Sequence, residues 1–432
     1  MPEFSQIKEN DSVLTIKPQL VHELSAEILD HWSLLDRNNN GGIEKADIAS
    51  AIIDKRVTGK LSIAVAALEQ VPTISWLAAD EKPGISMADI QALKNLSSQE
   101  TINLPAVTII QERSKLFDQN GDGSIDRSEF DTVRKKYLDS GSALALASLE
   151  FSSIAGRDEK LSQTELTAAV PSSLAVLEQV NKEAKKAEQR LSTSSSYLFG
   201  QNGTAEPSYQ DIKQGTAFDC YLLAGMASLA AQNPQSIKNM IRETGQNAFA
   251  VKFPELKDKA ISVAKPSDTE KAMYADTSKG QWPLIVELAY GKLKGERNGS
   301  QSIAPGENID FGQGVVAARL LSGEKAFDTP LKNRSKEDLS AELSFSTSHK
   351  LPVILSTANP PRDSGLRGFH AYAVLGFDSK TNTVKIMDPY RNLVIPQRDN
   401  ADGQEDGIFE MTVEELKKNF ALITTYDQNS NI

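Results

Sequence analysis

The chain has 432 residues, a formal net charge of −11 and one cysteine. This length exceeds that of one ordinary domain, and hydrophobic and charged fractions of 39% and 24% are typical of a soluble globular protein. The negative charge disfavours binding to the phosphates of nucleic acids. A single thiol excludes an internal disulfide and a zinc site built from several cysteines.

No apolar run approaches the roughly 20 residues that a membrane-spanning helix needs, so we expect no membrane span. The first residues, MPEFSQIKENDSV, carry neither the basic region nor the apolar stretch of a signal peptide. We therefore expect a cytoplasmic protein. These features do not predict its oligomeric state.

The pattern of apolar residues changes near the middle of the chain. Up to about residue 185 they recur at helical spacing, as in the stretch 20–35. Residues 186–208 pass from a charged helix into a serine-rich segment, which indicates a linker. Beyond it, a buried helix at 220–232 is followed by strand-like runs. The pattern therefore predicts an α+β chain whose N-terminal domain is all-α.

An acidic segment, DQNGDGSIDRSE, occupies residues 118–129. A loop that binds Ca²⁺ needs oxygen ligands at its positions 1, 3, 5, 7, 9 and 12, and a glycine at position 6. Gly123 stands at position 6, and Ile125 at position 8 would form the short strand that joins two such loops. The segment resembles the loop of the EF-hand family. Its ligands would be Asp118, Asn120, Asp122, the Ser124 carbonyl, Asp126 and Glu129.

A second copy of this pattern, DRNNNGGIEKAD, runs from residue 36 to residue 47. Its last ligand, Asp47, is one methylene shorter than the usual glutamate and reaches a bidentate pose less easily. We expect weaker Ca²⁺ binding or Mg²⁺ occupancy here, with a purely structural loop as the alternative. The ligands would be Asp36, Asn38, Asn40, the Gly42 carbonyl, Glu44 and Asp47.

Two further copies are degenerate. Their first positions, Ala78 and Ile154, have no side-chain oxygen and do not ligate a metal. They keep the apolar residue of position 8, which is Ile85 in one copy and Leu161 in the other. We expect them to be partner loops, so that residues 1–185 form two EF-hand pairs, each with one competent and one silent site.

Cys220 opens the apolar helical run of the C-terminal half. A helix N-terminus favours the thiolate through its dipole, although a lone cysteine beside leucines is usually inert core. Gln214 lies six residues earlier, and its amide and the Cys220 N–H would form an oxyanion hole. His370 heads one strand-like run and Asp388 ends the next, which is the order of catalytic residues in papain-like enzymes. His370 would take the thiol proton, and Asp388 would orient the imidazole.

Three stretches around these residues resemble the protease core of the calpains, which are relatives of papain. They are DIKQGTAFDCYLLAGMASLA, WPLIVELAYGKLKG and HAYAVLGF. The resemblance implies a calcium-regulated intracellular cysteine endopeptidase that acts on proteins or peptides. It also implies two lobes that meet at the active-site cleft, a Cys lobe at 209–325 and a His/Asp lobe at 326–432.

The resemblance further implies a calcium site in the protease core, with Asp211 and Glu287 as acidic ligands. A helix cap and a surface carboxylate are the alternative roles for these two residues. The sequence departs from the family where Asp388 replaces an asparagine, and where Tyr221 and Tyr390 replace tryptophans. A carboxylate at 388 would strengthen the charged form of the histidine and shift activity to higher pH, or weaken catalysis.

The order of the domains also differs, because animal calpains place their EF-hands after the protease. We expect Ca²⁺ in the N-terminal loops to reposition that domain relative to the cleft. The serine-rich stretch near residues 190–200 is a candidate for autolytic cleavage. A catalytically weak or dead calcium-sensing interaction protein is one alternative, and an acyltransferase using the same cysteine is another.

Overall fold

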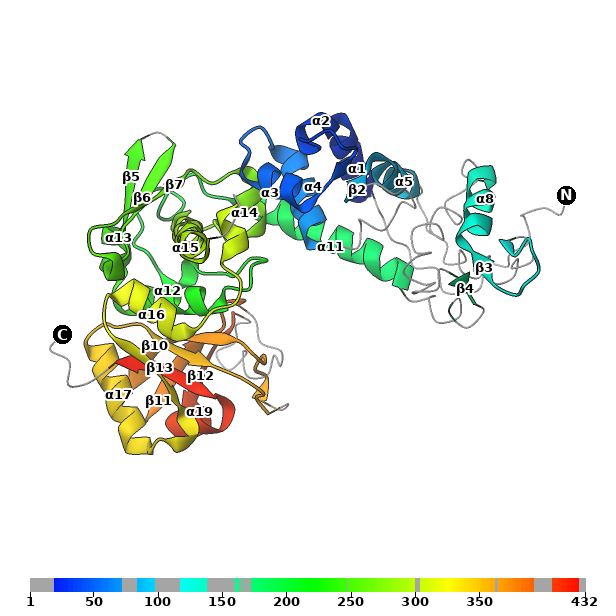
Figure 1. The fold of residues 1–432 in the computed structure, drawn as a ribbon. Coiled ribbons are helices and arrows are strands. Elements are labelled where there is room, and N and C mark those ends of the chain that lie inside the picture. Colours follow the sequence, from blue (N-terminus) through cyan, green and yellow to red (C-terminus); the bar gives the residue numbers. More distant parts are fainter. Residues whose placement is uncertain are drawn as a thin grey trace. The chain divides into compact units, whose positions relative to one another are not determined.

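A computed structural model describes residues 19–71, 84–97, 117–137, 160–162, 165, 172–245, 247–299, 304–361, 364–391 and 406–426. The chain forms two compact units, Met1–Gln189 and Arg190–Ile432 (Figure 1). The boundary lies within helix α11 (Ser172–Thr193), so the beginning of the predicted linker is helical. No helix in these ranges has both the length and the apolar character needed to cross a bilayer.

The first unit contains two loop pairs joined by short strands. Ile43 of β1 lies opposite Ile85 of β2, and Ile125 of β3 lies opposite Leu161 of β4. The predicted pairing of each acidic loop with a degenerate loop is thus confirmed. The elements of this unit before α11 are α1 (Gln19–Asp30), α2 (Trp32–Leu35), β1 (Gly42–Ile43), α3 (Lys45–Ile53), α4 (Gly59–Gln70), β2 (Ile85–Ser86), α5 (Met87–Ser97), β3 (Ile125–Asp126), α8 (Arg127–Tyr137) and β4 (Lys160–Leu161).

The second unit begins with helices around an antiparallel three-stranded sheet, β5–β6–β7. Helix α12 is buried from Tyr221 to Ala230, because its sequence is apolar on every face. The elements are η3 (Tyr209–Asp211), α12 (Cys220–Gln232), α13 (Pro234–Met240), β5 (Ile241–Gly245), β6 (Ala248–Val251), η4 (Pro254–Leu256), β7 (Ile261–Ala264), α14 (Asp268–Met273), α15 (Trp282–Asn298), η5 (Pro305–Asn308) and α16 (Gly314–Ser322).

A six-stranded antiparallel sheet follows, in the order β12-β11-β10-β9-β13-β8. Helices and antiparallel sheets in separate stretches of the chain make the second unit an α+β fold. The elements are β8 (Ala326–Pro330), η6 (Leu331–Asn333), α17 (Lys336–Ser348), β9 (Val353–Ser356), β10 (Ala371–Asp378), β11 (Thr383–Met387), β12 (Ile408–Thr412), α19 (Val413–Asn419) and β13 (Leu422–Tyr426).

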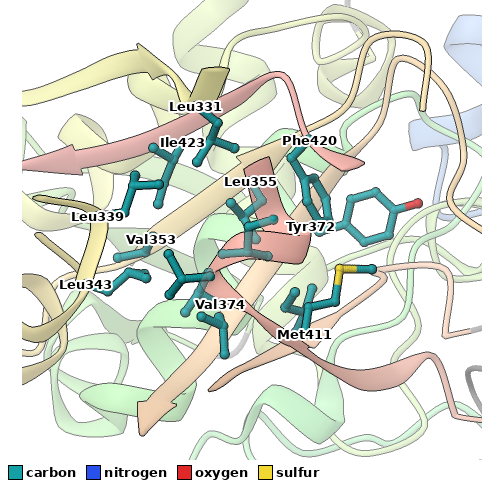
Figure 2. Close-up of a cluster of buried hydrophobic side chains, with 14 of the residues drawn as sticks. Leu331, Leu339, Leu343, Val353, Leu355, Tyr372, Val374, Met411, Phe420 and Ile423 are labelled. Carbon is teal, nitrogen blue, oxygen red and sulfur yellow. The ribbon is translucent and has the colours of Figure 1, made fainter. Parts of the chain in front are cut away.

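Both faces of this sheet are covered by helices. On β9, Val353 and Leu355 belong to the apolar cluster that includes Leu339 and Leu343 of α17 (Figure 2). The residue between them, Ile354, points to the opposite face, where it contacts α12 and α16 at their glycines. Strands that are buried on both faces have nearly continuous runs of apolar residues, and the sequence of this chain contains such runs.

One hydroxyl fixes α12 to the sheet. The Ser228 Oγ donates to the Val374 carbonyl at 2.7 Å and accepts the Val353 N–H at 2.8 Å. Ser228 is fully buried, so water does not replace either bond. This contact sets the position of α12, and therefore of its first residue, relative to β9 and β10.

We expect Ser228→Ala to lower the free energy of unfolding by about 2 kcal/mol or more, because it leaves a buried N–H and a buried carbonyl unpaired. Urea unfolding of the full chain measures this loss. The matched control is Ser348→Ala, which removes an exposed hydroxyl and should change the unfolding free energy by less than about 0.5 kcal/mol. Equal effects of the two variants would contradict the role of Ser228.

Candidate active site

Cys220 is the first residue of α12 and is partly exposed. It lines a cavity of about 670 Å³ that also includes His370, Gln214 and Tyr390. The N–H groups of the first helical turn face this position, and they favour negative charge on the sulfur. The predicted thiol, imidazole and amide therefore share one cavity.

The strand register brings the histidine and the carboxylate together. His370 directly precedes β10, Asp388 directly follows β11, and the antiparallel pairing of Ala373 with Met387 puts these two ends side by side. The His370 Nε2 lies 2.8 Å from the Asp388 Oδ1. Because Asp388 holds Nε2, Nδ1 is the nitrogen left for the thiol.

The imidazole is fixed on its remaining sides. Tyr390 stacks on the ring with 5.3 Å between centroids, and Tyr372 packs edge-on at 4.9 Å. The main chain of His370 is bonded to Thr357, whose N–H donates to the His370 carbonyl at 2.9 Å and whose Oγ1 accepts the His370 N–H at 3.0 Å. Tyr390, a departure from the family pattern, thus supports the ring by stacking.

Asp388 is fully buried and has three donors. The Tyr390 N–H donates to Oδ1 at 2.8 Å, and the Arg367 Nε donates to Oδ2 at 3.2 Å. The Arg367 guanidinium also lies over the Tyr390 ring, 5.1 Å from its centroid. Sequence reasoning missed Arg367, because a single arginine in a loop carries no motif and only the tertiary contact reveals its role.

The charge balance favours a protonated His370. Burial opposes charge on the ring, but hydrogen bonds to Asp388 and Cys220, with the charges of both groups, raise the pKa of His370 to about 9. At neutral pH the imidazolium is therefore the main form. An imidazolium beside a thiol stabilises the thiolate.

Gln214 lines the cavity, and its side-chain amide already makes one hydrogen bond. Its Nε2 donates to the Ala217 carbonyl at 2.7 Å, which leaves the second amide hydrogen for another acceptor. The Gln214 main-chain N–H donates to the Pro389 carbonyl at 2.8 Å. This bond joins the segment before the nucleophile to the segment that carries Asp388.

The two acidic residues predicted as core calcium ligands have different partners. Asp211 belongs to a capping box with Ser208, and its Oδ2 accepts the Trp282 Nε1–H at 2.8 Å. Its alternative role as a helix cap is the one seen here. Glu287 is fully buried, so its alternative role as a surface carboxylate is wrong. Its Oε2 accepts the Ala275 N–H at 2.8 Å.

Glu287 faces Asp219, the residue before the nucleophile. Burial raises the pKa of Asp219 to about 7, and burial and the charge of Asp219 raise the pKa of Glu287 well above its usual range. Binding of a cation to a carboxyl group releases its proton. Calcium ligation by Asp211 and Glu287 stays a prediction.

The loop at 118–129 has the donor set and the turn that Ca²⁺ requires. Gly123 has φ +84°, a conformation that favours glycine, and its N–H donates to the Asp118 Oδ2 at 2.9 Å. Hydrogen bonds from the main chain and hydroxyl of Ser124 lower the pKa of Asp122 to about 2. The Glu129 carboxylate accepts hydrogen bonds from the N–H groups of Gln119, Asn120 and Asp126, so its oxygens face into the loop.

Hydrogen bonds also link the ligand side chains of the loop at 36–47. The Asn38 and Asn40 amides both donate to Glu44, while the Asp47 carboxylate accepts N–H groups of Arg37 and Glu44. The donors are chemically suited to a hard cation in both loops. Among the described residues, no three His, Cys, Asp or Glu side chains are gathered in a metal-binding arrangement. Ligation in either loop stays a prediction.

Comparison with known proteins agrees with the geometry of the cavity. A thiol and an imidazole at one cavity, with a buried carboxylate bonded to the imidazole, are the groups of a cysteine hydrolase. The family model described as calpain family cysteine protease matches residues 168–394, which is more than half of the chain. The chain therefore belongs to the calpain family of cysteine proteases. No curated protein matches it.

We expect Asp388→Asn to move the alkaline limb of kcat/KM to lower pH. The thiolate form is active while His370 is protonated, so activity is lost as the pH rises through the pKa of about 9. Replacing the carboxylate removes an interaction that raises this pKa, so the loss begins at lower pH. The measurements are pH–rate profiles and the pH dependence of iodoacetamide labelling of Cys220.

The control for this prediction is Glu410→Gln, which removes an exposed carboxylate of β12. It should leave the alkaline limb in place. An alkaline limb that stays at the same pH in Asp388→Asn would contradict the assigned partner of His370.

Proposed function

We propose that the chain is a calcium-regulated cysteine endopeptidase with Cys220 as nucleophile. The observation that carries this proposal is the hydrogen bond of His370 to Asp388, in a cavity that His370 lines together with Cys220. The parts at 209–325 and 326–432 would be the two lobes. The first contributes the thiol, and the second contributes the imidazole and the carboxylate.

In the proposed reaction, the Cys220 thiolate attacks the carbonyl carbon of a peptide bond and forms a C–S bond. The free amide hydrogen of Gln214 stabilises the negative oxygen that results. The proton on His370 Nδ1 then passes to the leaving amine as the C–N bond breaks, leaving an acyl-enzyme. His370, now neutral, takes a proton from water, whose oxygen attacks the thioester carbon. The C–S bond then breaks, which releases the acyl group as a carboxylic acid and restores the thiolate. Asp388 keeps the ring oriented through both proton transfers.

The calcium-responsive part of the proposal rests on the paired loops of the first unit. Ca²⁺ bound at Asp118–Glu129 would neutralise carboxylates that now accept loop N–H groups, and so reorient the flanking helices. The strand pair of Ile125 and Leu161 links this loop to its silent partner. The loop at Asp36–Asp47 is linked to a silent partner in the same way.

Autolytic cleavage, if it accompanies activation, is better placed just after the predicted stretch 190–200. Ser195 is buried, its N–H donates to the Thr277 carbonyl at 2.9 Å, and its Oγ donates to the Gly200 carbonyl at 2.9 Å. Residues 201–206 are exposed and have no helix or strand. An exposed segment outside helices and strands enters a protease cleft more readily than a buried one, so we propose cleavage within 201–206.

We expect purified wild-type protein to cleave a casein-type substrate with Ca²⁺ and not in excess chelator, and Cys220→Ala to cleave under neither condition. The measurement is gel electrophoresis with mass spectrometry of the fragments. Self-cleavage should yield new termini within 201–206. Intact substrate with wild-type protein under both conditions would contradict the endopeptidase proposal, and equal cleavage under both would contradict its calcium regulation.

We expect Ca²⁺ to bind both loops of the first unit, and Glu129→Gln to weaken binding at residues 118–129 by on the order of tenfold or more, because it removes a charged ligand. Isothermal titration calorimetry measures both affinities. The matched control is Glu165→Gln in the silent partner loop, which should leave both affinities unchanged. Binding that is identical in Glu129→Gln and wild type would contradict the assigned site.

A further inference from the structure

Three exposed phenylalanines surround the active-site cavity. Phe218, Phe311 and Phe369 are 55%, 75% and 81% exposed, and all three line the cavity that holds Cys220 and His370. Among the described residues, the only other exposed large apolar side chains are Met87 and Tyr197, at 47% and 48%, and neither lines this cavity. Isolated exposed apolar residues are common, but three at one cavity mark a surface for an apolar ligand.

Two of these side chains are held outward by an unusual main chain. Phe311 has φ +53° and Phe369 has φ +50°, in the left-handed region that bulky residues rarely adopt. The Phe311 N–H donates to the Phe218 carbonyl, and the Phe369 N–H donates to the Ala358 carbonyl, both at 3.0 Å. Neither phenyl ring gains burial in return for this strain. Strain of this kind, kept without a packing benefit, occurs at sites where it serves function.

The positions of the three rings bracket the reacting groups. Phe218 lies two residues before Cys220 and stacks on Phe311, with 5.2 Å between centroids and 10° between planes. Phe369 directly precedes His370 in the chain. The chain therefore places one stacked aromatic pair beside the nucleophile and one aromatic ring beside the base.

Two glycines let the main chain beside the rings pack closely against its neighbours. At Gly312, an added Cβ would lie 2.2 Å from the Tyr221 ring, and at Gly368 it would lie 3.0 Å from the Ala358 carbonyl oxygen. Both glycines directly adjoin an exposed phenylalanine and line the cavity. The main chain thus passes close to the site while the phenyl rings project from it. An extended peptide has room to lie along such a surface with its side chains against the rings.

We propose that Phe311, stacked on Phe218, and Phe369 are specificity-determining residues that select polypeptides with large apolar side chains next to the scissile bond. This inference rests on the proposed endopeptidase function. An apolar substrate side chain removes water from the exposed rings, whereas a short polar side chain leaves the rings hydrated. Losing such a contact typically lowers kcat/KM by about 10- to 200-fold.

The test compares two internally quenched peptides that carry either leucine or serine at the two residues on each side of the scissile bond. The variants are Phe311→Gly and Phe369→Gly, because glycine accepts the positive φ, and Phe218→Ala. We expect each variant to lower the leucine-to-serine ratio of kcat/KM by about tenfold. The melting temperature of the two glycine variants should not fall, since the lost rings are exposed and the strain is relieved.

The matched control is Tyr197→Ala, which removes an exposed ring of the same unit that does not line the cavity. It should leave the ratio unchanged. An unchanged ratio in the Phe311 and Phe369 variants would overturn the proposal. So would an equal loss on both peptides accompanied by a lower melting temperature, because that result indicates a structural role.

Binding of uncleaved peptides separates this proposal from the endopeptidase itself. In the Cys220→Ala background, fluorescence anisotropy of the labelled leucine and serine peptides should show tighter binding of leucine, and Phe311→Gly or Phe369→Gly should reduce the difference. If wild-type protein cleaves neither peptide but this preference is present, the endopeptidase fails and the aromatic site stands. If wild-type protein cleaves both peptides equally well, the aromatic proposal fails and the endopeptidase stands.

Discussion

The bond between His370 Nε2 and Asp388 Oδ1 forms where two neighbouring strands of the six-stranded sheet end. Antiparallel pairing decides which residues meet there, since a slip of one residue would turn Asp388 to the other face of the sheet. The same sheet carries α12 on one side, and Ser228 fixes that helix to it. The position of the thiol relative to the imidazole is therefore a property of the sheet as a whole.

The buried carboxyl groups near the site are stabilised in two ways. Asp388 is paired with Arg367 and His370, so its negative charge is compensated by two cationic groups. Asp219 and Glu287 face each other, and burial raises the pKa of both. Two neighbouring buried carboxyl groups repel each other when both are ionised, which favours a proton on one of them. Asp219 directly precedes Cys220 in the chain, and Asp388 is bonded to the histidine that shares the cavity with Cys220.

Much of this arrangement could be predicted from the sequence, because its signals are local. Loop spacing predicts which residues pair at Ile43 and Ile125, and strand patterns place His370 and Asp388 at element ends. What could not be predicted depends on contacts between distant segments. The serine-rich stretch has the composition of a free linker, yet Ser195 is fixed by Thr277 and the stretch is followed by an exposed segment. Composition describes the behaviour of a segment in water and not which acceptor a distant loop offers it, as the loop between α14 and α15 does here with Thr277.

The main-chain hydrogen bond from Gln214 to Pro389 has a consequence for the regulation of this calpain-family protein. It ties Gln214, the proposed donor to the oxyanion, to the segment that carries Asp388, the hydrogen-bond partner of His370. In the proposed reaction, a displacement of either segment would change both the stabilisation of the oxyanion and the basicity of the histidine. A regulator that acts on one of these segments needs only a small movement to lower both contributions, and activity then falls as the product of two changes.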